Sequence, residues 1–350
     1  MTPSNSAAKL KVACAGTGYF SQFHYEAWTR VGAVELVGVY NRSRDKADEF
    51  RARYEIPYSG TSLADLLDKT QAEVLDIITP PATHLESVRI AAERGVHVIC
   101  QKPFGEDLAQ AEAMVDLADR HGIKLVIHEN FRFMPWYRKI KTVLDSGALG
   151  RVLNAEFKLR PGDGQGPEAY LARQPYFQDM PRFLVHETAI HLVDTFRFLF
   201  GEPESVYADL RRCNPVIKGE DSGLIVFQFP EQLQVVFDGN RLLDHSASNT
   251  RRTMGELEIC GTQAELRLDG EARLWLRNFG EQTAAPLEYE WRDQFFGGDC
   301  VYETIAHIVR HFCEDAPLEN QGRDYLHNIH IENAIYDAAA QGRRITLENA

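Results

Sequence analysis

The sequence predicts an α/β protein in which an N-terminal, doubly wound parallel sheet precedes a C-terminal α+β domain with a large, mostly antiparallel open sheet. Three observations lead to this prediction. Strand-like and helical patterns alternate through the first third of the chain, which is typical of a parallel sheet with helices on both faces. Strand patterns, several joined by glycine turns, dominate from Ser205 to Trp291, as in antiparallel sheets. The length of 350 residues favours about two domains, which we place at residues 1–128 and 129–350.

In the first domain, apolar β-rich runs predict strands, and apolar residues at helical spacing predict helices. The predicted strands are Lys11–Ala15, Val34–Tyr40, Val74–Ile78, Val96–Cys100 and Lys124–Ile127. The predicted helices are Phe20–Arg30, Arg44–Tyr54, Leu63–Leu67, His84–Arg94 and Ala109–His121, the last with Gly122 as its C-cap.

After about residue 129 the pattern changes. A helix is predicted over Pro135–Ser146, a strand over Val152–Leu159 and a long apolar helix over Phe183–Phe200. The strand-rich region that follows predicts an antiparallel meander. Its strands are expected in the runs SVYADLRR, GLIVFQF, LQVVFDG, ELEICG, AELRLDG, ARLWLRN and LEYEW. Helical patterns return over Val301–Gln341.

Composition argues against several classes of protein. The 51 acidic and 38 basic residues give a net charge of −13, whereas a nucleic-acid binder needs a basic face. No apolar run approaches the roughly 20 residues of a membrane helix. The six cysteines are scattered, which favours reduced thiols. We therefore expect a cytoplasmic protein that binds neither nucleic acids nor membranes, with disorder confined to the small, polar residues 1–8.

A glycine-containing turn follows the first predicted strand. Gly16 and Gly18 are followed by Tyr19 and Phe20, and these four residues are candidate cofactor contacts; Ser21 stands where a third glycine is usual. With a strand before it and a helix after it, this turn fits the Rossmann fingerprint, in which the pyrophosphate of a dinucleotide sits on the helix N-terminus. An ordinary glycine-containing turn between strand and helix is the alternative.

The end of the second predicted strand bears on the choice of cofactor. An acidic residue is expected there, about 20 residues after the turn, to bind the ribose of NAD. Asn41 occupies this place, with Arg42 and Arg44 beside it. The amide removes the repulsion of a 2′-phosphate, and arginine can pair with that phosphate or stack on adenine. NADP is therefore slightly favoured, NAD remains compatible, and a solvated basic turn is the alternative.

Two further motifs carry titratable groups. Gln101 and Lys102 follow a predicted strand at the edge of the sheet where ligands bind; lysine there can stabilise a developing alkoxide, although Lys-Pro alone is usually a surface turn. Glu187 and His191 are four residues apart on a predicted helix, so the carboxylate can orient the imidazole as a general base. The spacing HExxxH differs from the HExxH of zinc enzymes, so we expect no metal; buried core residues are the other alternative.

The chain resembles the Gfo/Idh/MocA family, the glucose–fructose oxidoreductase and inositol dehydrogenase-like enzymes, from about Lys9 to Leu347. The motifs that carry the resemblance are GTGYFSQFH, ITPPATHLE, QKPFGEDLAQAEAM, ENFRFMPWYRKIK with the later DSGALGRV, and HETAIHLVDTFRFLFG. The resemblance implies a Rossmann domain, a substrate domain whose open sheet forms homodimers or homotetramers, and hydride transfer between a sugar or polyol and a nicotinamide.

The resemblance also implies roles for individual residues. Lys102 matches the lysine of the family's EKP motif, and Glu187 with His191 matches its D-x-x-x-H pair, whose histidine transfers a proton. The stretch containing Thr79, Pro80, Pro81 and His84 matches residues that line the nicotinamide side, and Asn130 matches a pocket asparagine.

The sequence departs from the family pattern at three positions. Ser21 replaces the third glycine, Gln101 replaces the usual glutamate of EKP, and Glu187 replaces an aspartate. An amide must therefore take any role of the missing glutamate, and the Glu187–His191 pair gains one methylene of reach.

Substrate contacts are expected from the irregular segment at residues 159–183. The candidates are Arg160, Asp163, Tyr176 and Arg182, because a polyol needs several directed hydrogen bonds; each is equally compatible with a structural role. The absence of a dense Lys/Arg cluster disfavours a phosphorylated sugar. The run RQPYFQDMPRF resembles dehydrogenases that oxidise small aldoses, such as the branched pentose apiose, to lactones.

The sequence thus predicts an NAD(P)-dependent sugar or polyol dehydrogenase with Lys102, Glu187 and His191 in catalysis. Carbonyl reduction, or a glycosidase or dehydratase reaction assisted by NAD, are alternatives within the same family. A cofactor-binding sensor is a non-catalytic alternative, against which the intact catalytic residues argue.

Overall fold

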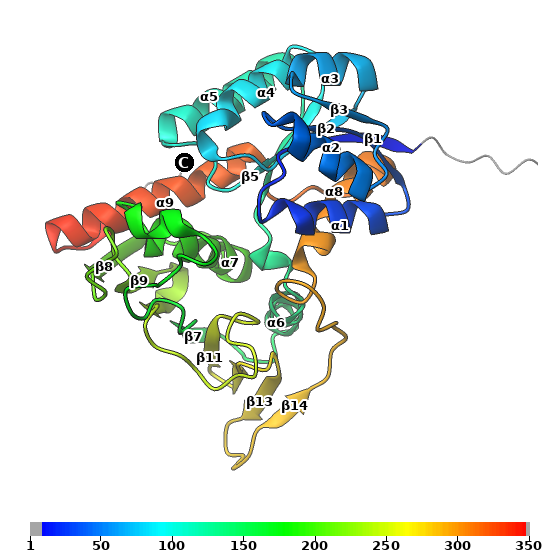
Figure 1. The fold of residues 1–350 in the computed structure, drawn as a ribbon. Helices are drawn as coiled ribbons and strands as arrows, with labels where there is room; N and C mark the ends of the chain where they lie inside the picture. The colour runs from blue at the N-terminus through cyan, green and yellow to red at the C-terminus, as the bar shows by residue number, and fades with distance from the viewer. Residues whose placement is uncertain (1–8, 348–350) are drawn as a thin grey trace, which may run out of the picture. The chain divides into compact units, whose positions relative to one another are not determined.

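The computed structural model describes residues 9–347, so the predicted disorder of residues 1–8 lies outside the described part. The chain forms two compact units (Figure 1). Unit 1 contains residues 9–130 and Val301–Leu326, and unit 2 contains Phe131–Cys300 and residues 327–347. This division differs from a single boundary between residues 128 and 129, because a C-terminal segment returns to unit 1.

Unit 1 is built on a six-stranded sheet with the order β3-β2-β1-β4-β5-β6. Its strands are β1 (Leu10–Ala15), β2 (Val34–Tyr40), β3 (Tyr58–Gly60), β4 (Val74–Ile77), β5 (His97–Gln101) and β6 (Leu125–His128). All neighbouring strands are parallel, which confirms the predicted doubly wound sheet. The strand order reverses between β1 and β4, and ligands of such sheets bind at the reversal. The three residues of β3 are too few to produce a pattern, and this strand was not predicted.

Helices cover the sheet of unit 1. They are α1 (Ser21–Arg30), α2 (Arg44–Arg53), α3 (Leu63–Thr70), α4 (His84–Ala92), α5 (Leu108–His121) and, from the C-terminal segment, most of α8 (Cys300–Glu314). In Figure 1, α4 and α5 lie on one side of the sheet and α1 and α8 on the other. Gly122 ends α5 in the left-handed conformation, with φ of 67°, as predicted.

The C-terminal segment joins unit 1 through the edge of the sheet. The backbone N–H of Ile127 in β6 donates to the carbonyl of Asn320, and Val126 forms an antiparallel bridge with Gln321. The guanidinium of Arg30 in α1 lies 4.5 Å from the centre of the Tyr302 ring in α8. These contacts are long-range in sequence, so local patterns could not reveal them.

Unit 2 contains a nine-stranded sheet with the order β14-β13-β12-β11-β7-β10-β9-β8-β15. Its strands are β7 (Val152–Leu159), β8 (Ser205–Arg211), β9 (Ser222–Gln228), β10 (Gln234–Asn240), β11 (Gly255–Gly261), β12 (Ala264–Leu268), β13 (Leu274–Asn278), β14 (Ala285–Leu287) and β15 (Ile345–Thr346). The sheet is mostly antiparallel, as predicted, but β7 and β10 pair in parallel.

The predicted meander is wrong in one respect. The consecutive strands β10 and β11 do not pair; β7 lies between them and pairs with both. Alternating burial marks each strand but does not tell which strand is its neighbour, so the insertion of an earlier strand leaves no local signal. The run LEYEW is also not a strand beyond Leu287, where β14 ends.

The helices of unit 2 are α6 (Pro135–Asp145), α7 (Ile190–Phe200) and the larger part of α9 (Gly322–Gln341). The predicted helix over Phe183–Phe200 begins with a π-helical turn, η4 (Leu184–Ala189), before α7. Such turns are frequent at functional sites. Within residues 9–347, no helix has the length and apolar character needed to cross a membrane.

Candidate active site

The turn after β1 requires glycine at its first position. Gly16 has φ of +118°, and a Cβ there would lie 2.9 Å from the backbone carbonyl of Ile78. A Cβ on Gly18 would meet no atom within 4 Å, so this glycine leaves open space rather than relieving a clash. Ser21 is fully buried and its Oγ donates to the Gly18 carbonyl at 2.6 Å. The turn therefore keeps the room for a close ligand that the dinucleotide fingerprint needs, and serine fills the place of the third glycine.

Two aromatic residues follow this turn. Tyr19 is exposed, at 47%, and its ring contacts Phe23 edge-on at 6.1 Å between centroids. Phe20 packs against Phe23 and His24 of α1. The two aromatic residues predicted to contact the cofactor therefore have different surroundings. Tyr19 lies at the surface, and Phe20 packs on α1.

Asn41 lies at the end of β2 and is held by two hydrogen bonds. Its Nδ2 donates to Oγ1 of Thr17 at 2.6 Å, and its Oδ1 accepts from the backbone N–H of Ser43 at 2.8 Å. The amide therefore connects the glycine turn to the start of α2. This arrangement fixes the orientation of Asn41 at the predicted ribose position.

The two arginines of this turn differ in their partners. Arg44 is ion-paired with Asp48, with 3.1 Å between Nε and Oδ2. Arg42 is exposed and, among residues 9–347, forms no ion pair or hydrogen bond. Arg42 is thus the arginine of the pair whose charge is available to a phosphate.

The loop after β4 is tied together by a buried histidine. His84 is fully buried, and its Nε2 donates to the carbonyl of Thr79 at 2.7 Å. The Thr83 hydroxyl donates to the carbonyl of Pro80 at 2.9 Å. Burial lowers the pKa of His84, partly offset by backbone carbonyls of Thr79 and Pro103. His84 is therefore a neutral structural support for the predicted nicotinamide-side loop.

At the end of β5, Gln101 contacts both its neighbour and the helix after the glycine turn. Its Oε1 accepts from the backbone N–H of Lys102 at 2.8 Å, and its Nε2 lies 3.0 Å from Nε2 of His24. Lys102 is half-buried and precedes a cis proline, Pro103. Asn130, near the end of unit 1, is buried at 3% exposure. Gln101, Lys102 and Asn130 belong to unit 1, together with the glycine turn and Asn41.

In unit 2, Glu220 anchors the start of the π-helical turn. Its Oε1 accepts from the backbone N–H groups of Phe183 and Val185, each at 3.1 Å, and from the Tyr336 hydroxyl at 2.6 Å. A carboxylate that accepts N–H groups left unpaired at a helix N-terminus stabilises that terminus. The segment that carries Glu187 is therefore fixed at its beginning.

His191 lies in the first turn of α7 and is buried at 7% exposure. Its imidazole stacks on Phe131 with 4.0 Å between ring centroids and 2° between planes. Phe131 is held close by its neighbour Arg132, which forms a bidentate pair with Asp194, both N···O distances being 2.7 Å. Asp194 also accepts from Asn328 at 2.8 Å. The ring plane of the predicted base is thus set by packing.

Two of the predicted substrate residues are engaged with other parts of unit 2. Arg160 pairs with the carboxylate of Asp238 and donates to its backbone carbonyl at 2.7 Å. Arg182 donates to Asn333 at 3.1 Å and lies 4.3 Å above the ring of Tyr336. Both side chains hold the segment in place, and their contact with substrate stays a prediction.

Asp163 is part of a buried charged group. Arg241, at 2% exposure, pairs with Asp163 at 2.8 Å and donates to the hydroxyl groups of Tyr170 and Thr188 at 2.8 and 2.6 Å. Arg173 also reaches Asp163, at 3.2 Å. Because Thr188 lies in the π-helical turn, this group joins the irregular segment to the turn that bears Glu187.

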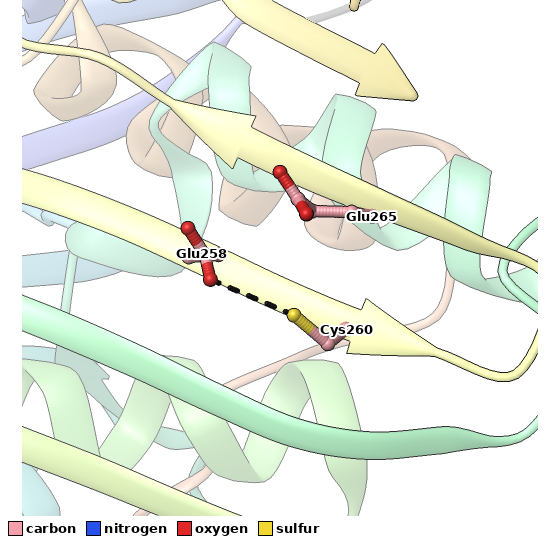
Figure 2. Close-up of side chains that lie close together, drawn as sticks. All are labelled: Glu258, Cys260 and Glu265. Atoms are coloured by element: carbon pink, nitrogen blue, oxygen red, sulfur yellow. Dashed lines mark hydrogen bonds between the residues drawn. The ribbon is translucent and has the colours of Figure 1, made fainter. Parts of the chain in front are cut away.

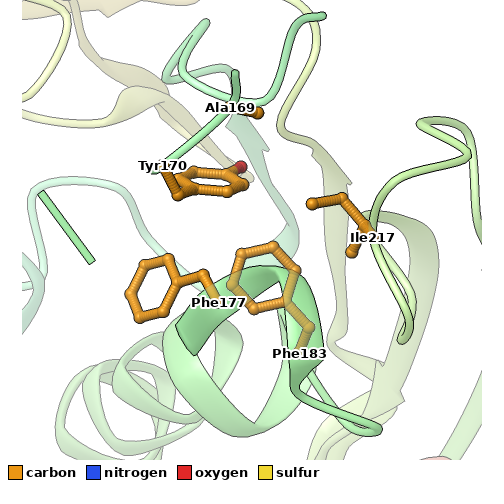
Figure 3. Close-up of a cluster of buried hydrophobic side chains, with 5 residues drawn as sticks. All are labelled: Ala169, Tyr170, Phe177, Phe183 and Ile217. Atoms are coloured by element: carbon orange, nitrogen blue, oxygen red, sulfur yellow. The ribbon is translucent and has the colours of Figure 1, made fainter. Parts of the chain in front are cut away.

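An apolar cluster stabilises the same segment (Figure 3). Its buried members are Ala169, Tyr170, Phe177, Phe183 and Ile217. The guanidinium of Arg241 lies 4.7 Å from the centre of the Phe183 ring, so the charged group borders the cluster. Residues 159–183 are therefore ordered by both apolar and ionic contacts.

Tyr176 is the predicted substrate residue with an exposed ring, at 56%. Its hydroxyl accepts from Nε2 of Gln174 at 3.0 Å. Desolvation by neighbouring atoms and then the negative charge of Glu187 raise the pKa of Tyr176 to about 12. The segment thus brings a neutral phenol into electrostatic range of the predicted catalytic carboxylate.

Sequence reasoning missed several residues that shape these sites. No sequence motif indicates a role for His24, Asp76, Arg132 or Arg241. One signal was present for Asp76, a charged residue inside the otherwise apolar strand β4, since a charge there needs partners. Arg241 follows a strand directly and carries no comparable signal.

A group of three potential ligand side chains lies on β11 and β12 (Figure 2). The ligand atoms of Glu258, Cys260 and Glu265 are within 4.8 Å of one another. Glu265, however, already pairs with Arg267 and Arg277, both at 2.6 Å, and burial raises the pKa of Cys260 to about 11. A carboxylate already paired with two arginines and a protonated thiol make a poor cation site.

Comparison with known families gives two matches. A model described as an oxidoreductase family with an NAD-binding Rossmann fold matches residues 10–129. A model of the GFO/IDH/MocA C-terminal domain matches residues 137–267. Both confirm the resemblance seen in the sequence motifs.

Two curated relatives span nearly the whole chain. D-apiose dehydrogenase of Paraburkholderia graminis is 29% identical over 348 residues, covering 97% of this chain and 90% of the relative. D-apiose dehydrogenase of Rhizobium rhizogenes is 28% identical over 346 residues, covering 97% and 98%.

Solved structures agree in fold. An oxidoreductase from Agrobacterium radiobacter, in complex with NAD+, L-tartaric acid and magnesium, has a TM-score of 0.86 and 27% identity, covering 97% of this chain and 98% of that chain. Levoglucosan dehydrogenase in complex with NADH and levoglucosan has a TM-score of 0.84 at 20% identity, covering 98% and 100%; at this identity the likeness supports the fold alone.

Proposed function

The chain belongs to the Gfo/Idh/MocA family of oxidoreductases, whose two models together match more than half of it, and from this premise we propose that it oxidises a hydroxyl group of a small sugar or polyol by hydride transfer to NAD(P). The substrate class that we favour is an aldose oxidised at its anomeric carbon to a lactone. The observation that carries this choice is the match to two D-apiose dehydrogenases over 97% of this chain.

The residues of unit 1 fit a dinucleotide. Gly16 leaves no room for a side chain and Gly18 opens onto free space, which is the cradle that a pyrophosphate needs at a helix N-terminus. When bound, the nicotinamide dinucleotide supplies the hydride acceptor of the reaction. We propose that the glycine turn, Asn41 and the loop at Thr79–His84 hold it, with Tyr19, Phe20 and Asn130 as further contacts.

The choice between NAD and NADP depends on the end of β2. Position 41 carries the amide of Asn41 and not an acidic side chain, which would repel a 2′-phosphate. The exposed Arg42 has no ionic partner among the described residues. Arginine pairs with phosphate through two parallel hydrogen bonds. This supports NADP as the slightly favoured cofactor, while Asn41 remains able to hydrogen-bond the ribose of NAD.

In the proposed mechanism, His191 accepts the proton of the reacting hydroxyl group. Stacking on Phe131 holds the plane of its ring, which restricts the directions in which its nitrogens can point, as a general base requires. Glu187 assists by stabilising the imidazolium that forms. Lys102 holds the reacting oxygen and stabilises its developing negative charge. The carbon then loses a hydride, and an anomeric hydroxyl group becomes a lactone carbonyl.

The substrate segment supplies a further proposed contact. Tyr176 is exposed and within electrostatic range of Glu187, so its phenol can donate to a sugar oxygen. Arg160, Asp163 and Arg182 are already engaged within unit 2. We propose that these three shape the segment and that Tyr176 makes the direct contact.

The open sheet is the proposed surface for assembly into homodimers or homotetramers. Along β9 and β10, apolar side chains of the less buried face stay partly exposed, namely Leu224, Val226 and Val236. Light scattering of the purified chain at several concentrations tests this proposal; a monomer at all of them contradicts it.

A substrate screen tests the proposed function. Purified protein is incubated with a panel of aldoses that includes D-apiose, and with polyols, each with NAD and NADP in parallel. We expect an aldose to give reduced nicotinamide and a lactone, which traps as a hydroxamate. If both dinucleotides bind but no aldose or polyol reduces either, the proposal is wrong.

A further inference from the structure

A chain of hydrogen bonds connects Lys102 to the core of unit 1. The Lys102 backbone N–H donates to Oε1 of Gln101 at 2.8 Å. Gln101 Nε2 lies 3.0 Å from Nε2 of His24, whose Nδ1 lies 2.8 Å from Oδ2 of Asp76. The same carboxylate oxygen accepts from the indole N–H of Trp28 at 2.7 Å. All of these groups belong to unit 1.

The inner part of this chain is shielded from water. His24 and Asp76 are both fully buried, and the His24 imidazole packs against His128 with 4.1 Å between centroids and the rings tilted by 37°. Phe20, from the glycine turn, packs on the edge of His24 at 5.7 Å. In such surroundings a hydrogen bond with mismatched donors or acceptors is costly, because no water can replace it.

The donors and acceptors in this series of hydrogen bonds can be assigned from the groups at its two ends, the Lys102 backbone N–H and the Asp76 carboxylate. A backbone N–H can only donate, so the oxygen of the Gln101 amide must face Lys102 and its NH₂ group must face His24. A carboxylate can only accept, so His24 Nδ1 carries a proton toward Asp76. His24 Nε2 is then left to accept from Gln101, which makes His24 the neutral Nδ1–H tautomer.

We propose that Gln101 is a positioning residue for Lys102, and that its amide is matched to a neutral His24. The amide donates inward to His24 and accepts from the Lys102 backbone, so it fixes the start of the segment that carries the lysine. This inference rests on the catalytic role proposed for Lys102. It also explains why position 101 carries a glutamine, since this position needs a hydrogen-bond donor and an acceptor at once.

A glutamate at this position would demand a different proton arrangement. One carboxylate oxygen could still accept from the Lys102 N–H, but the other would face the lone pair of His24 Nε2. The repulsion is relieved when a proton enters between the two groups, and because imidazole is a stronger base than a carboxylate, we expect this proton on His24, which becomes an imidazolium between two carboxylates. Gln101→Glu is therefore expected to take up one proton at His24 that the parent chain lacks.

Nitrogen NMR of histidine-labelled protein tests the assignment without any activity measurement. In the parent chain at about neutral pH, we expect His24 to show a protonated Nδ1 and an unprotonated Nε2. In Gln101→Glu we expect both nitrogens to be protonated. Asp76→Asn and His24→Gln identify the resonances. An imidazolium at His24 in the parent chain, or the same state in both proteins, would overturn the proposal.

A double-mutant cycle tests the positioning role. Gln101→Met should lower kcat by about 10- to 100-fold, because a displaced catalytic group loses its alignment. Dinucleotide Kd should change by less than about 3-fold, since uncoupled sites act independently. In a Lys102→Ala background, the same substitution should lower kcat by less than about 2-fold further. The exposed Gln282→Met serves as the matched control.

The outcomes separate the two claims. If Gln101→Met lowers kcat by the same factor in the parent chain and in the Lys102→Ala variant, Gln101 does not act through the lysine. Full turnover of Lys102→Ala alone would instead refute the role of Lys102 in the proposed function, and the positioning role with it. A thermal melt of each variant identifies any loss that comes from unfolding.

Discussion

The ring of Phe131 lies parallel to the imidazole of His191, with 4.0 Å between centroids and 2° between planes. Phe131 is itself fixed by its neighbour Arg132, whose bidentate pair with Asp194 joins the segment before α6 to α7. The two motifs ENFRF and HETAIHLVD, far apart in the sequence, therefore meet at the proposed base. This contact gives the aromatic residue directly after Asn130 a role in supporting the proposed base.

Removing this contact should impair catalysis without unfolding the protein. Phe131→Leu keeps an apolar side chain but leaves one face of His191 unsupported, so we expect kcat to fall by about 10-fold. The measurement is the steady-state rate with the best sugar from the screen. Phe279→Leu, at an exposed position, is the control. Unchanged turnover in Phe131→Leu would show that the stacking has no part in orienting the base.

Cofactor choice should depend on Arg42 and not on Arg44. Arg42→Ala should weaken NADP binding by about 10- to 100-fold, the range of a lost charge-assisted hydrogen bond, and leave NAD binding nearly unchanged. Arg44→Ala is the matched control, because that arginine already pairs with Asp48. Fluorescence titration of both dinucleotides measures the effect. Equal losses for NAD and NADP would point to stacking on adenine instead.

The buried pair of Arg241 and Asp163 should matter for stability. Arg241→Met leaves a largely buried carboxylate with a weaker set of partners, so we expect the free energy of unfolding to fall by about 3–5 kcal/mol. Arg89→Met removes an exposed arginine that pairs with Glu86 and Glu93 and should lower the free energy of unfolding far less, because solvent screens exposed ion pairs. Urea unfolding of both variants tests this, and a similar small loss in both would contradict it.

His84 should make the protein less stable in mild acid. Its pKa is lowered in the folded state by burial, so below its ordinary value the unfolded chain binds a proton that the folded chain does not. Stability is therefore lost as pH falls below about 6.5. His84→Gln retains a donor for the Thr79 carbonyl and should flatten this dependence between about pH 7.5 and 5.5. Parallel curves for the parent and the variant would rule out this contribution.

Much of unit 1 could be predicted because its signals are local. Each parallel strand is a short apolar run, and Gly16 and Gly122 mark the turns at which the chain must adopt a positive φ. The placement of β7 between β10 and β11 had no such signal, since pairing depends on contacts between distant segments. The return of Val301–Leu326 to unit 1 is long-range in the same way.

In the candidate site, too, the residues with local signals could be predicted and those that depend on distant contacts could not. Motifs indicated Lys102, Glu187 and His191 as candidates, but not the groups that hold them. Gln101 looked like the loss of a carboxylate until its contacts with His24 and the Lys102 N–H were seen. Arg241 and Asp163 meet from strands and loops far apart in sequence, which no spacing reveals.

The pH dependence of kcat, compared between the parent chain and His191→Asn with the same sugar, shows whether His191 takes the hydroxyl proton. We predict that the parent rate rises with pH as the base loses its proton, and that His191→Asn is slower by about 10²- to 10⁴-fold and lacks this dependence. Dinucleotide binding should be unchanged in the variant. An identical pH profile in both proteins would contradict the assignment of His191 as the base that takes the hydroxyl proton.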